Sequence, residues 1–241
     1  MSQSSTASIT VLLVGGRETR HLRVPKQILP FGDSTVLGRT IKAYLDAGFA
    51  DVLLVLGYKA DLIASELGDL PPGVRIVRNP LFDEGMSSFL RAGLRELPAS
   101  ATGFCIGLED QPLLTPELLK EFADAFVAGK KPILVPAYQG SLGLPAFFRA
   151  SMAEELSQLK QTEDLWDVMK RHGDELIDHA TGFSAVVRSI EDTDDYHALL
   201  RTARLPIPEI QPPPPPPPPP APEPEPGPEA IAESGPEPIA E

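Results

Sequence analysis

Short apolar runs that alternate with helical patterns are the feature that most restricts the fold of this chain. We expect strands at 9–14, 51–57, 74–77, 104–108, 132–135, 146–148 and 185–188. We expect helices at 36–45, 62–67 and 86–97, one from 116, two within 152–171, and a short one at 194–200. Apolar strands separated by amphipathic helices favour a mostly parallel, doubly wound α/β sheet, Rossmann-like in layout. In such sheets ligands bind beyond the carboxyl ends of the strands.

Proline content divides the chain into a domain and a tail. Of the 28 prolines, 17 follow Arg204, and nine of these form the run at 212–220. The same segment holds seven Glu but no Lys, Arg or Asp, and so little apolar content cannot build a core. We therefore expect a flexible N-terminus at 1–8, a folded domain at 9–204 and a disordered tail at 205–241. The tail is interpreted as a solvated spacer or, alternatively, as a polyproline ligand that recruits a protein partner.

Charge and cysteine usage exclude several classes of protein. The chain has 34 acidic and 21 basic residues, and it lacks the basic footprint of a nucleic-acid-binding protein. The single Cys105 cannot form an internal disulfide, which fits a reducing compartment. No apolar stretch reaches the roughly 18 residues of a membrane span, and residues 1–8 do not resemble a signal peptide. We expect a cytoplasmic protein with no membrane or nucleic-acid partner.

A loop with glycines and cations follows the first expected strand. Gly15 and Gly16 would allow a phosphate to approach the backbone closely, with amide hydrogens pointing inward. Arg20 and Lys26 could neutralise the β- and γ-phosphates of a nucleotide. The loop lacks the Gly-Lys-Ser/Thr of a Walker motif and does not fit G-x-G-x-x-G. On its own, it is also compatible with a surface turn bearing solvated charges.

Carboxylates follow two other expected strands. Asp110 stands where the strand at 104–108 ends and could hold Mg²⁺. Glu191 follows the last expected strand and could supply a second metal ligand. Gly85, Ser87 and Ser88 place hydroxyls and free amides at a helix start, where they could contact a ribose or a base. Each of these patterns is also compatible with ordinary helix capping or an acidic loop.

Taken together, these segments resemble the MobA-like NTP transferase family. The resemblance rests on the loop with Gly15-Gly16, Arg20 and Pro25-Lys26-Gln27, and extends in order over roughly residues 9–200. Further matches are Asn79-Pro80, Gly85-Met86-Ser87-Ser88, Asp110-Gln111-Pro112 and Gly143-Leu144-Pro145, which look like the molybdenum cofactor cytidylyltransferase branch. The resemblance implies a nucleotide-diphospho-sugar transferase fold, phosphate-binding Arg20 and Lys26, and a metal-binding Asp110.

The chain departs from the family pattern on the side of the acceptor substrate. His21-Leu22 replaces a Met-Gly pair, Leu144 replaces the histidine of Gly-His-Pro, and Ser189-Ile190-Glu191 replaces Asp-Ile-Asp. The family's Gly-Asp-x-Gly-Ala-Arg stretch is not recognisable in Gln161-Thr162-Glu163-Asp164. The second metal ligand would therefore be a glutamate.

The resemblance implies Mg²⁺-dependent transfer of CMP or GMP from CTP or GTP to a phosphorylated acceptor, with release of pyrophosphate. Molybdopterin is the expected acceptor. Gly15-Gly16 is the pair typical of guanylyl enzymes, but three other segments look cytidylyl-like, so we expect CTP to be preferred. Two alternatives are a sugar- or alditol-phosphate nucleotidyltransferase and a catalytically impaired adaptor that recruits partners through its proline tail.

Overall fold

The computed structural model describes residues 5–15, 22 and 24–208 of the chain. Its strands are β1 (Ile9–Val14), β2 (Pro30–Phe31), β3 (Ser34–Thr35), β4 (Asp51–Leu56), β5 (Val74–Arg78), β6 (Gly103–Leu108), β7 (Ile133–Tyr138), β8 (Ser141–Leu142), β9 (Ala146–Arg149) and β10 (Leu176–Ala180). Its α-helices are α1 (Val36–Asp46), α2 (Ala60–Leu67), α3 (Met86–Leu94), α4 (Pro116–Ala128), α5 (Ala153–Ser157), α6 (Leu165–Arg171) and α7 (Thr193–Ala203).

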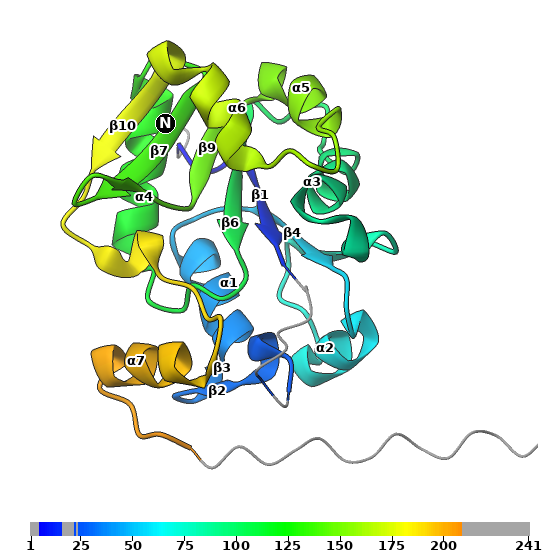
Figure 1. The fold of residues 1–241 in the computed structure, drawn as a ribbon, viewed down its shortest axis with the longest axis vertical. Coiled ribbons are helices and arrows are strands. Elements are labelled where there is room, and N and C mark those ends of the chain that lie inside the picture. The colour runs from blue at the N-terminus through cyan, green and yellow to red at the C-terminus, as the bar shows by residue number, and fades with distance from the viewer. Residues whose placement is uncertain (1–4, 16–21, 23, 209–241) are drawn as a thin grey trace, which may run out of the picture.

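One twisted sheet organises the domain, as Figure 1 shows. Its strand order is β10-β7-β9-β6-β1-β4-β5, with β8 paired to β7. The β1–β4, β1–β6, β4–β5 and β7–β10 pairs are parallel, whereas β9 runs antiparallel to both β6 and β7. The expectation of a mostly parallel α/β sheet is therefore confirmed.

Helices cover both faces of this sheet. Residues alternate along β1, so that Val11 and Leu13 pack under α1, α2 and α4, while Leu12 and Val14 pack under α3, α5 and α6. Both sets are fully buried, which is why β1 reads as a continuous apolar run. Thr115 caps α4 by accepting a hydrogen bond from the Leu118 amide, so the helix begins where its cap residue and proline predicted.

The last strand of the sheet is not the one that the sequence predicted. Residues 185–188 do not form a strand; Ser184–Val187 is a 3-10 helix. Their apolar side chains indicated burial, and Ala185 and Val186 are indeed buried. The final strand is β10, which pairs with β7. It was missed because Asp178 and His179 interrupt its apolar pattern, as is tolerated on an edge strand.

A third apolar cluster lies apart from the two faces of the sheet. It joins α7 to the β2–β3 hairpin through Leu29, Phe31, Ile190, Tyr196 and Leu200. The Tyr196 hydroxyl donates a hydrogen bond to the carbonyl of Pro30 in β2. In Figure 1, α7 lies beside β2 and β3, at the opposite end of the molecule from α5. This cluster positions the 3-10 helix Lys26–Ile28 and the residues that precede α7.

Among the residues that the structure describes, no helix combines the length and the apolar character needed to span a membrane.

Candidate active site

The register of β1 against β6 sets the geometry at the carboxyl end of the sheet. Val14 pairs with Leu108, so the residues that follow, Gly15 and Glu109, lie next to each other. A methyl group built on Gly15 would overlap the carboxylate of Glu109. Because the Glu109 side chain occupies this space, position 15 accepts only glycine while that side chain stays in place.

Asp110 joins the chain's first loop to the segment before α7. It is 1% exposed. Its Oδ2 atom lies 2.7 Å from Lys26 Nζ and accepts a hydrogen bond of 2.7 Å from the Ile190 amide. Lys26 Nζ also donates to the Ile190 carbonyl at 3.0 Å. Three segments distant in sequence therefore converge on one carboxylate.

Lys26 is held in its charged form. Burial acts to lower the pKa of Lys26, but the carboxylates of Asp110, Glu109 and Glu191 outweigh it, so the pKa lies above its ordinary value. Only 15% of the side chain is exposed. A buried ammonium among carboxylates carries a strong local charge, since screening by water is weak there. Such a cation is suited to a phosphate.

Glu109 is a second buried carboxylate at this point, and the sequence did not single it out. It is 1% exposed, and its Oε1 atom accepts a hydrogen bond of 2.7 Å from the side-chain amide of Gln27. Gln27 follows Lys26 in the same 3-10 helix, so neighbouring residues of that helix contact neighbouring residues after β6. Gln111 then donates to the carbonyls of Leu144, Ala185 and Val186 at 3.2–3.3 Å.

The remaining oxygen of Asp110 is suited to a metal. Asp110 Oδ1 is buried and has no hydrogen-bond partner within the described residues, and a buried anionic oxygen needs one. Among all the residues that the structure describes, no group of three or more His, Cys, Asp or Glu side chains is placed to hold a metal. A cation at Asp110 would therefore take most of its ligands from phosphates and water, as Mg²⁺ commonly does. Glu191 acts electrostatically on Lys26 and directly follows Ile190, so it lies near this site.

The start of α3 is built differently from the expectation. Gly85 precedes the helix with a φ of 86°, a backbone conformation that favours glycine. Ser88 Oγ donates to the Gly85 carbonyl and accepts from Asn79, both at 2.8 Å. Ser87 is fully buried. Both hydroxyls are thus inside the protein, and Ser88 fixes the turn itself.

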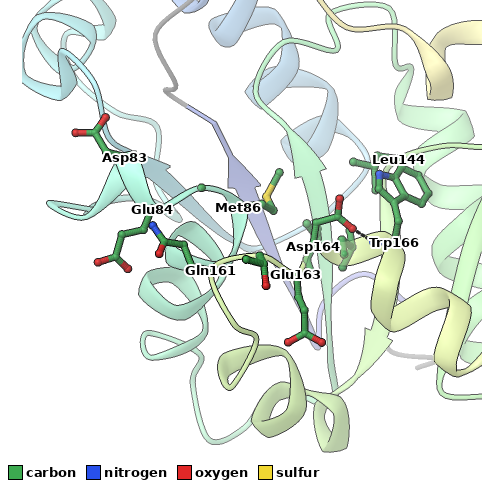
Figure 2. A pocket seen from close by; sticks show the side chains of 12 residues that line it. Asp83, Glu84, Met86, Leu144, Gln161, Glu163, Asp164 and Trp166 are labelled. Atoms are coloured by element: carbon green, nitrogen blue, oxygen red, sulfur yellow. Dashed lines mark hydrogen bonds between the residues drawn. The ribbon is translucent and has the colours of Figure 1, made fainter.

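A cavity of about 470 Å³ lies between this turn and the loop that precedes α6. Figure 2 shows Met86 on one side of it and Leu144, Asp164 and Trp166 on the other. Trp166 also packs against the core under α3, α5 and α6. Nothing in the sequence pattern brought these residues together, because they come from α3, the loop between β8 and β9, and the start of α6.

A charged network fixes the loop beneath the cavity. Arg171 binds Glu155 at 3.1 Å and Glu163 at 2.9 Å, while His172 binds Glu155 at 2.8 Å and Glu175 at 2.7 Å. The hydrogen bond to Glu175, with that to Glu155, raises the pKa of His172 above its ordinary value. The network ties α5 and α6 to the loop that carries Glu163.

The structure thus brings Gly15, Lys26 and Asp110 together and places Glu191 close by. Gly85 borders the cavity instead. Gly16 and Arg20 lie outside the described residues, as does most of the proline-rich tail.

Comparisons with known proteins identify the family to which this fold belongs. Residues 10–176 match the model of the MobA-like NTP transferase domain. The chain is 28% identical to the crystal structure of Rv0371c from Mycobacterium tuberculosis H37Rv, with a TM-score of 0.72 over 81% of this chain and 99% of the other. A manganese complex of Rv0371c is 29% identical, with a TM-score of 0.68 over 81% and 99% of the two chains.

Two further matches are more distant. A nucleotidyl transferase from Methanothermobacter thermautotroptrophicus is 24% identical, with a TM-score of 0.67 over 80% of this chain and 97% of the other, and shows the fold alone. The bifunctional protein GlmU of Kineococcus radiotolerans is 26% identical over 137 residues, which are 56% of this chain and 28% of that protein. The match therefore spans little more than a quarter of that relative.

The matched region covers the strands β1 to β9, together with Lys26 and Asp110. The chain therefore belongs to the MobA-like NTP transferase family and is a nucleotidyltransferase of that kind.

Proposed function

We propose that this protein transfers CMP from CTP, or less readily GMP from GTP, to a phosphorylated acceptor, with molybdopterin as the expected acceptor. The observation that carries the proposal is the buried Lys26–Asp110 pair beyond β6, with Asp110 Oδ1 left without a hydrogen-bond partner in the described chain. A cation and an anionic metal ligand, side by side at the carboxyl end of a parallel sheet, suit a nucleotide with its metal.

The residues of the site would share the work as follows. A divalent metal held by Asp110, with Glu191 as the second carboxylate, would neutralise phosphate charge. Lys26, released from Asp110 Oδ2, would bind the β- and γ-phosphates together with Arg20. Gly15 and Gly16 would let the triphosphate approach the backbone. Catalysis would then consist mainly of positioning and charge neutralisation while an acceptor phosphate oxygen attacks the α-phosphorus.

The packing of Gly15 supports the preference for CTP. Gly15 was the one residue that pointed to a guanylyl enzyme, but the Glu109 carboxylate gives a structural reason for glycine at this position. Gly15 then no longer argues for GTP. Three cytidylyl-like segments still favour CTP: Pro25-Lys26-Gln27, Gly85-Met86-Ser87-Ser88 and Asp110-Gln111-Pro112.

The proposal is tested by measuring pyrophosphate release from the full chain with CTP or GTP, Mg²⁺ or Mn²⁺, and molybdopterin. Asp110→Asn should keep the fold at reduced stability, because the buried Lys26 loses its carboxylate. It should reduce release by orders of magnitude, because an amide is a poor ligand for these metals, and thermal unfolding verifies that the variant is folded under the assay conditions. Lys26→Ala should weaken nucleotide binding as well as turnover. Asp46→Asn, which alters an exposed ion pair with Lys42, is the matched control and should behave as wild type.

Each outcome discriminates between the alternatives. Full activity of Asp110→Asn would show that the site lies elsewhere. Release of pyrophosphate with a sugar phosphate but not with molybdopterin would favour the sugar-phosphate enzyme. Nucleotide binding without turnover on any acceptor would favour the adaptor.

A further inference from the structure

The cavity next to the start of α3 is linked to the proposed catalytic residues. Leu144 lines the cavity, and its carbonyl accepts a hydrogen bond of 3.2 Å from Gln111. Gln111 directly follows Asp110. Ile106, two residues before the end of β6, forms part of the cavity wall. An acceptor substrate that places its phosphate near Asp110 therefore has this cavity within reach for the rest of its structure.

The lining of the cavity is unsuited to an anion. It includes the carboxylates Asp83, Glu84, Glu163 and Asp164, and neither Lys nor Arg is among the described residues that line it. Two guanidinium groups contact lining carboxylates and are engaged by them: Arg91 with Glu84 at 2.8 Å, and Arg171 with Glu163 at 2.9 Å. Negative potential without a free cation disfavours a negatively charged group inside the cavity.

Asp164 is the carboxylate that faces the cavity. Its Oδ1 atom caps α6 by accepting from the amides of Trp166 and Asp167, at 2.9 and 3.2 Å, which leaves Oδ2 outside the cap. In Figure 2 this carboxylate lies between Met86 and the indole of Trp166, whereas Asp83 and Glu163 point away from that ring. Asp164 is exposed, and an ionised carboxylate only accepts hydrogen bonds, so a ligand that contacts it in place of water has to offer a donor.

Apolar side chains form the rest of the cavity wall. Met86, Ile106, Leu144 and Leu165 line the cavity together with Trp166. An indole presents a flat face to a ring, and apolar walls with one or two well-placed polar groups are typical of small-molecule sites. The volume of about 470 Å³ is ample for one or two fused rings.

We propose that this cavity binds the ring of the acceptor substrate, that the ring is uncharged or cationic, and that it donates an N–H or O–H hydrogen bond to Asp164 Oδ2 while lying against Trp166. Asp164 and Trp166 are then specificity-determining residues. This inference rests on the proposed function for the position of the acceptor phosphate. Pterin heterocycles and sugar rings both offer such donors, so both are used as probes.

Trp166 makes the test direct, because it is the only tryptophan in the chain. Free pterin and glucose, both without phosphate, are titrated into the full chain with CTP and Mg²⁺ while tryptophan fluorescence is recorded. Free N-acetyltryptophanamide corrects for absorption by the probe. We expect saturable quenching by pterin, by glucose or by both, and the probe that quenches identifies the type of ring.

The decisive comparison uses Asp164→Asn. Asparagine is as good a helix cap as aspartate, so α6 should persist, which thermal unfolding verifies. Loss of a hydrogen bond to a charged group should weaken binding of the probe about tenfold or more. Asp174→Asn removes the same charge from an exposed position outside the cavity and should leave the affinity unchanged.

The outcomes separate this inference from the proposed function. If neither probe binds, or if Asp164→Asn binds as tightly as Asp174→Asn, the inference is wrong even when pyrophosphate is released. If the probe binds with the expected dependence on Asp164 but no acceptor yields pyrophosphate, the cavity assignment stands and the proposed function fails.

Discussion

Replacing Gly15 by alanine tests the packing that joins the first loop to β6. The added methyl group would occupy the position of the Glu109 carboxylate, so the glutamate must move. It is buried and accepts a hydrogen bond of 2.7 Å from Gln27. Breaking a hydrogen bond to a charged group costs about 1.5–3 kcal/mol. For a domain of this size, each kcal/mol lowers the melting temperature by about 2–4 °C.

We therefore expect Gly15→Ala to lower the melting temperature by about 3–12 °C. The single variant Glu109→Ala should also be destabilised, because it leaves a cavity and an unpaired Gln27 amide. In the double variant the new methyl group enters the space that the glutamate vacated. The double variant should accordingly be more stable than the sum of the two single effects predicts, by about 1–3 kcal/mol.

Thermal and denaturant unfolding of the four proteins measures this coupling. Strict additivity would refute the reasoning, since it would mean that Gly15 and Glu109 do not compete for one space. Nucleotide titrations on the same set address the base. If Gly15 reflects packing alone, Gly15→Ala/Glu109→Ala should not change the ratio of CTP to GTP affinity.

Further predictions concern stability. Lys26→Met should lower the free energy of unfolding by about 3–5 kcal/mol, because it leaves the buried Asp110 without its cation. Lys42→Met at an exposed pair should lower it by at most about 1 kcal/mol. Urea titration compares the two variants, and equal effects would show that the buried pair is not stabilising. The pKa of His172 is raised on folding, so its contribution should be complete below the unfolded value of about 6.5 and lost as pH rises through the folded pKa. Melting curves of wild type and His172→Gln should thus converge as pH increases, and a constant difference would contradict the linkage. Truncation after Pro208 should leave the melting temperature unchanged. Truncation after Arg204 should lower it slightly, because Leu205 packs against the apolar cluster under α7. Calorimetry of both truncated proteins measures the effect, and a large drop in melting temperature after truncation at Pro208 would show that the tail packs on the domain.

The sequence alone determined the architecture because burial on both faces of a parallel sheet leaves a strong local record. β1, β4 and β6 are near-continuous apolar runs, and each was predicted within a residue or two of its bounds. Thr115 and the following proline likewise marked the start of α4, since capping depends on neighbouring residues only. The edge strand β10 escaped detection for the opposite reason, because it is only partly buried and the polar residues Asp178 and His179 interrupt its apolar pattern.

The candidate site was only partly accessible from the sequence. Lys26 and Asp110 were identified as chemically suitable residues, but their contact depends on the packing of the 3-10 helix Lys26–Ile28 against the end of β6. Glu109 was passed over, since a carboxylate before Asp110 has no local signature. Only the pairing of Val14 with Leu108 reveals that Glu109 fills the space beside Gly15.

Which side chains line the cavity is determined entirely by tertiary structure. Met86, Leu144 and Trp166 lie far apart in the chain, and no periodicity relates them. Asp164 caps α6 and Trp166 packs against the core. Both also line the cavity, which follows only from the placement of the helices. Local patterns encode which elements form, because their energetics are local; which side chains share a cavity follows from long-range packing, which no single segment specifies.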